Sequence, residues 1–419
     1  MSQSLLPLIV GLAILAALVF GLWLDLRQIR WVRRRRDAVP DTFAGRIPLE
    51  DHRRSIDYAV ERLQLSMADS VVGSAATALL LLGGGFALLL KAVIVLAGSG
   101  YLGGLLLAGA TLVVFGVVEL PFAWWRTFRI EQKYGFNRTT FALFVADLAK
   151  GALVAAVLGT PLVLAIDFTM RNGGAFWWLA AWGLYVAFNL AMLLIIPTLV
   201  MPLFNKFEPL GDASLKGRIE ALLARCGFHA RGVFTMDGSK RSGHGNAFFT
   251  GLGPSKRIVL FDTIMASLTP SEIEAVLAHE LGHFKLRHIL KRMLFQFAAS
   301  LLIFALLGWL IAQPWFAAGF GVAPDAASAL PLASLILFLL ALPAFTGWFR
   351  GFSNWRSRVH EFEADAYAAG QTNGPDLASA LLKLHKDNAS PSTTDPLYST
   401  FKYSHPPTAE RIARLQATA

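Results

Sequence analysis

Long apolar runs alternate with short basic segments along the whole chain. A helix of about 20 apolar residues is long enough to cross the ~30 Å hydrocarbon core of a bilayer. Seven runs approach or exceed this length, so the pattern predicts seven membrane-spanning helices, of which the fourth is the shortest. The predicted spans are Leu5–Leu24, Val71–Leu90, Leu102–Trp125, Gly151–Ile166, Ala175–Val200, Met293–Gln313 and Pro331–Phe349.

The Lys and Arg residues give these predicted helices a direction across the membrane. If the spans alternate, nearly every Lys and Arg falls on one side, and the other side keeps little more than Lys91 and Arg171. Basic loops stay in the cytoplasm, so the pattern predicts an N-terminus on the outside. The segments assigned to the cytoplasm are Arg27–Arg62, Arg126–Lys150, residues 203–292 and residues 350–419.

Composition agrees with a membrane protein and excludes other classes. The chain is 55% hydrophobic and 16% charged, and its mean hydropathy of +0.52 is far above that of soluble domains. A net charge of +10 does not predict nucleic-acid binding, because the basic residues adjoin apolar runs instead of forming one stripe. The single cysteine, Cys226, excludes an internal disulfide and is expected to be a buried thiol.

A soluble insert of mixed character separates the fifth and sixth spans. Ser214–Cys226 is amphipathic at the helical period, and three short β-branched or aromatic runs predict strands at Val233–Met236, Ala247–Thr250 and Ile258–Phe261. Gly251, Gly253 and Pro254 predict a hairpin turn between the last two strands. The predicted fold is mainly α, with seven spans and a small cytosolic α+β domain. Its parts are residues 1–202, 203–292, 293–350 and 351–419.

The strongest chemical signal lies on a helix that begins after this hairpin. Thr269, Pro270 and Glu272 are the N-cap, first and third residues of a well-capped helix. Further along it, His279 and His283 are four residues apart, so both imidazoles share one face and can bind one metal ion. Glu280 is placed to take a proton from a metal-bound water, as in zinc peptidases.

A catalytic zinc needs a third protein ligand and an open position. The segment after the seventh span returns to the same side of the membrane and contains Glu361 and Asp365, which are four residues apart on a predicted helix. We expect Glu361 to bind the metal and Asp365 to orient a ligating imidazole. His360 and Glu363 compete with Glu361 for this role, and spacing alone favours Glu361.

Two other histidines are less easily placed from the residues alone. His288 lies five residues beyond His283, off the metal-facing stripe, and is expected to be solvated or interfacial. His405 precedes two prolines and has the context of an ordinary loop residue.

The chain resembles the type I CAAX prenyl proteases, which are seven-span zinc endopeptidases. The resemblance is carried in order over roughly residues 120 to 415. Its segments are Glu131–Asn137, Asp237–Gly251, Lys256–Thr263, the HELGH helix, Ser357–Asp365, and Ser404–Pro407 followed by Glu410 and Arg411.

The resemblance implies roles for individual residues. It makes Glu361 the third zinc ligand and Asp365 the aspartate that supports a ligand. It places His405 and Arg411 near the scissile carbonyl, where a cation or donor stabilises the oxyanion. It also implies that an edge strand receives the extended substrate by main-chain pairing. That substrate-binding strand is formed by Asn246, Ala247, Phe248 and Phe249.

The resemblance further implies that the spans enclose a chamber, which would accommodate the intramembrane polar residues Glu119 and Asn189. The expected activity is zinc-dependent hydrolysis of prenylated C-terminal CAAX-type peptides or of other membrane-associated peptides. An HtpX-like quality-control metalloprotease is the alternative, and a transporter or scaffold with structural zinc is a weaker one. The expected partners are the substrate and the bilayer. Ala, Gly and Arg richness suggests a bacterial inner-membrane protein with its site facing the cytoplasm.

Overall fold

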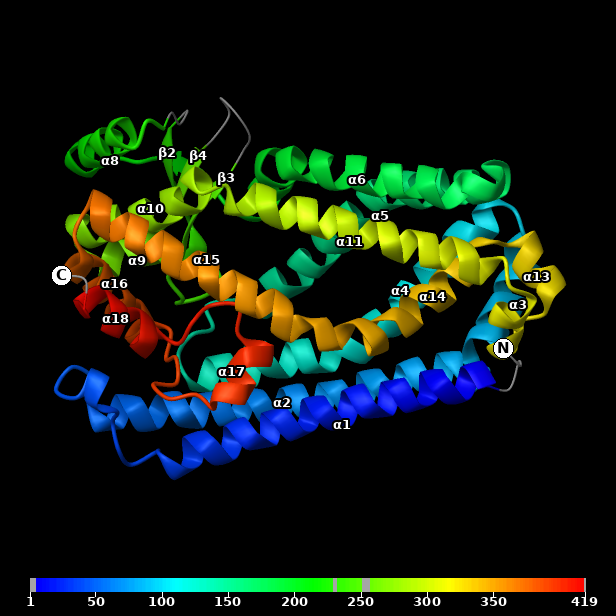
Figure 1. The fold of residues 1–419 in the computed structure, drawn as a ribbon, viewed down its shortest axis with the longest axis horizontal. Helices are drawn as coiled ribbons and strands as arrows, with labels where there is room; N and C mark the ends of the chain where they lie inside the picture. The colour runs from blue at the N-terminus through cyan, green and yellow to red at the C-terminus, as the bar shows by residue number, and fades with distance from the viewer. Residues whose placement is uncertain (1–4, 229–231, 251–256, 418–419) are drawn as a thin grey trace.

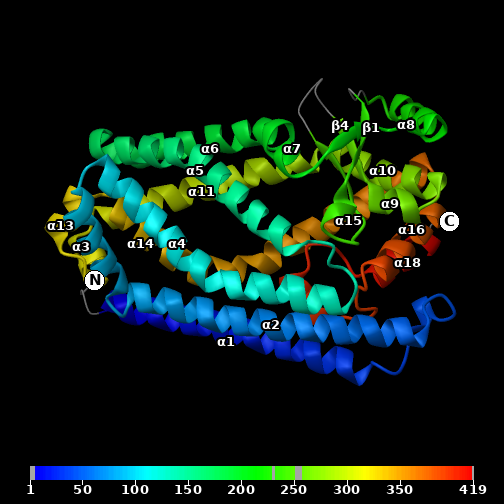
Figure 2. The same ribbon diagram turned by 180° about the vertical axis from the view of Figure 1, so that it is seen from behind.

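The computed structural model describes residues 5–228, 232–250 and 257–417. Long helices form an elongated body, and a small sheet lies with short helices at one end of it (Figures 1 and 2). Within the described residues, seven helical stretches are long and apolar enough to cross a membrane, as predicted. They are Leu5–Arg34, Leu49–Leu81, Tyr101–Glu131, Phe141–Asn172, Gly174–Phe204, His288–Ile311 and Leu332–Gln371.

The first two helices, α1 (Leu5–Arg34) and α2 (Leu49–Leu81), lie side by side along the body (Figure 1). They have 30 and 33 residues, which at 1.5 Å per residue makes them about 45–50 Å long and longer than the membrane core. The prediction that the second span, Val71–Leu90, continues to Leu90 is wrong. The helix stops at Leu81 because Gly84 has a left-handed backbone with φ of 76°. The chain then restarts as the short helix α3 (Gly85–Ala97).

The bounds of the remaining membrane helices differ from the predicted spans at one or both ends. A cavity of about 570 Å³ between α1, α2, α4 and α14 is lined in part by Glu119, which agrees with the expectation of a polar group beside a cavity. Asn189 instead donates to the Tyr185 carbonyl oxygen on its own helix, at 2.7 Å. The helices are α4 (Tyr101–Trp125), α5 (Phe141–Asn172), α6 (Trp177–Ile195), α7 (Met201–Phe204), α11 (His288–Ile311), α12 (Pro314–Gly319), α13 (Pro324–Ala329) and α14 (Leu332–Thr346).

The seventh span continues into the soluble end of the molecule. Helix α14 passes through the short turn Gly347–Phe349 directly into α15 (Arg350–Gln371), so one stretch of 40 residues crosses from the membrane to the sheet-bearing end. After α15 the chain forms α16 (Gly374–Asp387), α17 (Pro396–Lys402) and α18 (Thr408–Ala417). This continuity brings residues from the seventh span into the soluble domain.

The sheet has the strand order β1-β2-β4-β3, with β1 (Phe207–Pro209), β2 (Val233–Met236), β3 (Ala247–Thr250) and β4 (Arg257–Phe261). Strand β3 pairs antiparallel with β4 and is an edge strand of the described sheet. The expected hairpin turn at Gly251, Gly253 and Pro254 lies outside the described residues. The sequence missed β1, which is short and pairs antiparallel with β2.

One hydrophobic core unites the soluble domain. It joins α8 (Ala213–Arg225), the sheet, α9 (Asp262–Ser267) and α10 (Pro270–Lys285) with α15, α16 and α18. Ile219, Ile258 and Leu277 are fully buried in it, and Cys226 is a buried free thiol, as expected. Because segments on both sides of the last two spans share this core, their relative positions are fixed by packing.

Candidate metal centre

Two helices place three potential metal ligands at one point. His279 and His283 come from α10, and Glu361 comes from α15. The two Nε2 atoms are 3.2 Å apart. The Glu361 carboxylate oxygens lie 3.5 Å from Nε2 of His279 and 3.3 Å from Nε2 of His283. The three potential ligand atoms therefore lie close enough together to contact one metal ion.

The start of α10 is fixed by its capping box. The Thr269 hydroxyl accepts from the Glu272 amide, and the Glu272 carboxylate accepts from the Thr269 amide at 2.7 Å. Glu272 also receives a hydrogen bond from Lys383 of α16 at 2.7 Å. These bonds satisfy donors at the helix start and anchor it to the C-terminal helices.

Close packing of α10 against α15 brings the ligands together. A Cβ added at Gly282 would lie 3.1 Å from the Ala364 Cα and 3.3 Å from its Cβ. Gly282 lies between the two histidine positions on α10, and Ala364 lies between Glu361 and Asp365 on α15. Small residues at this crossing let the two helices approach closely enough to share one metal ion.

The three side chains fit a metal ion. Four ligands around zinc at 2.0–2.1 Å are separated from one another by about 3.3 Å in a tetrahedron, which is close to the observed separations. Oε2 of Glu361 is buried and has no hydrogen-bond partner within the described residues. Nη1 of Arg411 lies 3.6 Å from it, beyond hydrogen-bond distance, so a metal ion bound at this oxygen would satisfy it directly. The three residues could hold a metal ion, and a tetrahedral zinc held by them would keep one position open.

Asp365 and Arg411 support this site from behind. Oδ1 of Asp365 lies 2.8 Å from Nδ1 of His279, which orients Nε2 of that ring toward the metal position. Arg411 donates to Asp365 at 2.6 and 2.8 Å, and its Nη1 lies 3.6 Å from Glu361. Arg411 is buried and does not line the neighbouring cavity. The structure places Arg411 against Asp365 and Glu361, and a role near the scissile carbonyl stays a prediction.

His288 differs from the prediction of a solvated or interfacial residue, because it is buried. Its Nδ1 lies 3.0 Å from Nδ1 of His283, and its Nε2 lies 2.8 Å from Oε2 of Glu363. His360 stacks on the His288 ring with centroids 4.1 Å apart. Both competitors of Glu361 therefore lie beside His288, on the far side of His283 from the metal position. In the sequence, His288 is visible only as a histidine shortly after the HELGH motif. Its contact with His283 depends on its burial in the folded protein.

Glu280 lies in a cavity of about 220 Å³ with His279, His283 and Glu361. Burial raises the pKa of Glu280, and the two neighbouring histidines oppose this rise. A carboxylate with a raised pKa is a better proton acceptor for a metal-bound water.

His405 and the edge strand border the same cavity. Nε2 of His405 lies 3.5 Å from Oε1 of Glu361, and its Nδ1 lies 3.0 Å from the Ser404 hydroxyl. Phe248 and Phe249 of β3 line the cavity, whereas Ala247 begins the strand, Asn246 precedes it, and neither lines the cavity. Phe248, Phe249 and His405 thus lie beside the three candidate ligands, although they come from segments more than 150 positions apart.

Comparison with known proteins agrees with this geometry. A family model described as "CAAX prenyl protease N-terminal, five membrane helices" matches residues 28–206, and a second, "Peptidase family M48", matches residues 209–419. Together they span nearly the whole chain, and M48 peptidases depend on a metal ion.

Individual relatives agree with the family models. The chain is 39% identical over 306 residues to "CAAX prenyl protease 1 homolog" from Oryza sativa, covering 72% of this chain and 70% of the relative. Identity to "CAAX prenyl protease 1" of Saccharomyces cerevisiae is also 39%, covering 71% of this chain and 69% of the relative. Both relatives are eukaryotic and give no support to the expected bacterial source.

A solved structure resembles the whole fold. The crystal structure of S. mikatae Ste24p superimposes with a TM-score of 0.90 at 30% identity, and the match covers 98% of each chain. With the family models, the relatives and seven membrane helices, this likeness is sufficient for an assignment. The chain belongs to peptidase family M48 and is an integral-membrane metalloprotease.

Proposed function

We propose that this protein is a zinc endopeptidase whose metal is held by His279, His283 and Glu361. The convergence of their ligand atoms at 3.2–3.5 Å carries the proposal. Bound zinc would lower the pKa of a coordinated water to about 7 and polarise the scissile carbonyl. The donor set of two imidazoles and one carboxylate is typical of catalytic zinc sites, which keep one position open.

The surrounding residues supply the remaining chemistry. Glu280 takes the proton of the attacking water and delivers it to the leaving amine. His405, at the border of the cavity, donates to the oxygen that becomes negative in the tetrahedral intermediate. Asp365 holds His279 in the tautomer that leaves Nε2 free, and Arg411 holds Asp365. Arg411 is therefore a positioning residue in this proposal.

The substrate binds as an added strand at the free edge of β3. Asn246, Ala247, Phe248 and Phe249 would pair with its main chain, and such pairing tolerates varied side chains. The relatives named as CAAX prenyl proteases support a C-terminal CAAX-type peptide, prenylated or not, as the substrate class. The positive-inside distribution supports a site that faces the cytoplasm. Quality control of membrane proteins, as in an HtpX-like role, is the second candidate function.

Substitution of Glu280 by Gln tests the proposed chemistry. We expect Glu280→Gln to keep one zinc per chain, measured by metal analysis, and to lose peptidase activity on a farnesylated C-terminal peptide. Mass spectrometry of the products identifies the bond that is cleaved. His279→Ala is the matched variant that should lose the metal as well. Retained cleavage by Glu280→Gln would refute the role assigned to this residue.

A further inference from the structure

A second cavity adjoins the candidate metal centre and is cationic. It has a volume of about 580 Å³ and shares His405 with the smaller cavity that contains Glu280. Arg62 of α2, Arg126 after α4 and Lys402 of α17 line it, and the described lining includes no Asp or Glu. We call this cavity the cationic pocket.

Its positive charges are only partly balanced from outside. Lys402 pairs with Asp25 at 3.1 Å, and Arg62 makes a long contact of 3.4 Å with the Tyr58 hydroxyl. The Arg126 side chain makes no hydrogen bond or ion pair to another part of the described chain. Glu131 accepts a hydrogen bond from the Tyr58 hydroxyl at 2.7 Å, and its negative charge also acts on Arg62. Three cationic groups beside two external carboxylates leave an excess of positive charge, which favours an anionic ligand.

The direction of a bound substrate leads toward this pocket. The free edge of β3 pairs best with an antiparallel strand, because antiparallel pairing is more stable per residue. In that arrangement the C-terminal half of the substrate lies at the beginning of β3, near Ala247. His244 precedes this end and contacts the Asn388 side chain at 3.0 Å, and Asn388 lines the cationic pocket. Residues beyond the scissile bond therefore pass His405 and approach the cations.

We propose that the cationic pocket binds the C-terminal carboxylate of the substrate. This inference rests on the proposed function, the cleavage of a C-terminal CAAX-type peptide, in which only a short segment can follow the bond that is cleaved. The two cavities share His405, so a short extended segment, at about 3.3–3.6 Å per residue, can lead from one into the other. Arg62 and Arg126 are the proposed carboxylate-binding residues, with Lys402 adding long-range attraction. The position of the cleaved bond would thus be set by its distance from the C-terminal carboxylate of the substrate.

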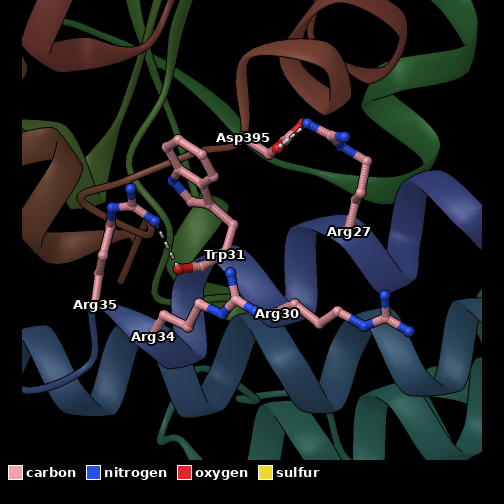
Figure 3. Close-up of a pocket in the computed structure, with 6 residues that line it drawn as sticks. All are labelled: Arg27, Arg30, Trp31, Arg34, Arg35 and Asp395. Atoms are coloured by element: carbon pink, nitrogen blue, oxygen red, sulfur yellow. Dashed lines mark hydrogen bonds and ion pairs between the residues drawn. The ribbon is translucent and has the colours of Figure 1, made fainter.

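The experiment compares one CAAX-type peptide with a free C-terminal carboxylate and the same peptide as a C-terminal amide. Wild-type enzyme in neutral detergent should cleave the acid with kcat/KM at least about tenfold higher than the amide, mainly through KM, because the amide lacks the charge-assisted pair with the arginines. The double variant Arg62→Gln/Arg126→Gln should bring the acid-to-amide ratio close to one. Arg30→Gln is the matched control. Arg30 lies in a separate arginine cluster on α1 (Figure 3) and should leave the ratio unchanged.

The acid-to-amide ratio decides between the possible outcomes. Equal cleavage of acid and amide by the wild type, or a ratio that survives the double substitution, overturns the proposal. A further outcome is that the double substitution leaves the acid-to-amide ratio unchanged and alters only the effect of anionic lipid vesicles on cleavage. That outcome would show that the pocket binds lipid phosphate, and it also overturns the proposal. If neither peptide is cleaved by the metal-loaded wild type, the proposed function itself fails.

A separate hydrogen-bond chain supports a second inference, which concerns the ligand His283. Glu363 accepts from Nε2 of His288 at 2.8 Å, so the remaining nitrogen of this ring, Nδ1, carries a lone pair when the ring is neutral. That lone pair lies 3.0 Å from Nδ1 of His283 and must accept a proton from it. The Nε2 atom of His283 then keeps its own lone pair, which points to the metal position.

The geometry assigns His288 and Glu363 as positioning residues that fix the tautomer of His283. Asp365 does the same for His279 directly, whereas His283 is fixed through an intervening imidazole. Such partners beyond the ligands typically contribute about 10- to 100-fold to metal affinity. This inference also rests on the proposed metal site.

Metal affinity, measured by competition with a chelator, tests the hydrogen bonds from Glu363 through His288 to His283 without a measurement of activity. His288→Leu should weaken metal binding about 10- to 100-fold, and His288→Gln, whose carbonyl can accept from His283, should restore part of it. Glu363→Leu should weaken binding in the wild type but have no further effect in His288→Leu. His360→Phe keeps the stacked ring and should leave the affinity unchanged.

Additive losses in the double variant, or unchanged affinity in His288→Leu, would overturn the assignment. His279→Ala separates this result from failure of the site as a whole. If His279→Ala still binds the metal, the proposed metal site is wrong. If it loses the metal while His288→Leu does not, only the hydrogen-bond chain is wrong.

Discussion

At the scale of single residues, helix phase and burial decide which of several similar side chains is placed to bind a metal ion. Glu361 and Glu363 are both carboxylates on α15, but only Glu361 faces the two imidazoles of α10. Glu363 and His360 face His288 instead. The HELGH pair was predictable from sequence because its geometry is local to one helix. The environment of His288 was not, because it depends on packing between α11 and α15.

Acid should destabilise the protein through a buried histidine outside the site. His385 is buried, its ring stacks on Phe43, and burial lowers its pKa from 6.5 to about 4. In the unfolded chain His385 takes up a proton near pH 6.5, whereas in the folded chain it does so only near pH 4. The free energy of unfolding therefore falls as the pH drops from 6.5 to 4. The loss is about 3 kcal/mol at most. Thermal unfolding in detergent should show this decline, and His385→Gln should flatten it. A wild-type midpoint independent of pH in this window would contradict the assignment.

At the scale of elements, the contact between α10 and α15 creates the metal centre. Each helix is indicated by its own sequence, but the distance between them depends on Gly282 and Ala364 at the crossing. The edge position of β3 likewise follows from the strand order and not from the strand's own residues. Elements were therefore predictable individually, whereas their contacts were not.

Enlarging the residue at this crossing should damage the metal site. Gly282→Ala adds a Cβ at 3.1 Å from the Ala364 backbone, so the helices must separate slightly. We expect a loss of about 1–3 kcal/mol in stability together with weaker metal binding. Gly217→Ala is the matched control, because Gly217 lies inside α8 with no atom within 4 Å of the added Cβ. That change should be neutral or stabilising by up to about 1 kcal/mol. Equal behaviour of the two variants in unfolding and metal-binding assays would argue against the packing explanation.

At the scale of the whole molecule, the first helix holds the C-terminal segment that carries His405. Arg27 binds Asp395 through two hydrogen bonds of 3.1 and 2.8 Å, as Figure 3 shows. The Trp31 indole donates to the Thr393 hydroxyl at 2.9 Å. These contacts join residues more than 360 positions apart. The site is thus completed by the membrane domain as well as by the soluble domain.

Topology can be tested with this chain because Cys226 is its only cysteine. In a Cys226→Ala background, Asn172→Cys should react with a membrane-impermeant maleimide in intact cells. Glu220→Cys, on α8, should react only after the membrane is opened. The positive-inside distribution predicts this difference. The reverse labelling pattern would show that the site faces outward.

The sequence alone determined the seven apolar spans, the capped helix with its two histidines, and the soluble insert, because these depend on local periodicity and short spacing. Tertiary structure decided the rest. It ended the second span at Leu81, buried His288, placed Arg411 behind Asp365, and joined the cationic pocket to the metal centre at His405. These features arise where segments distant in sequence share one core, and the contact energies that place them have no signature in any single segment.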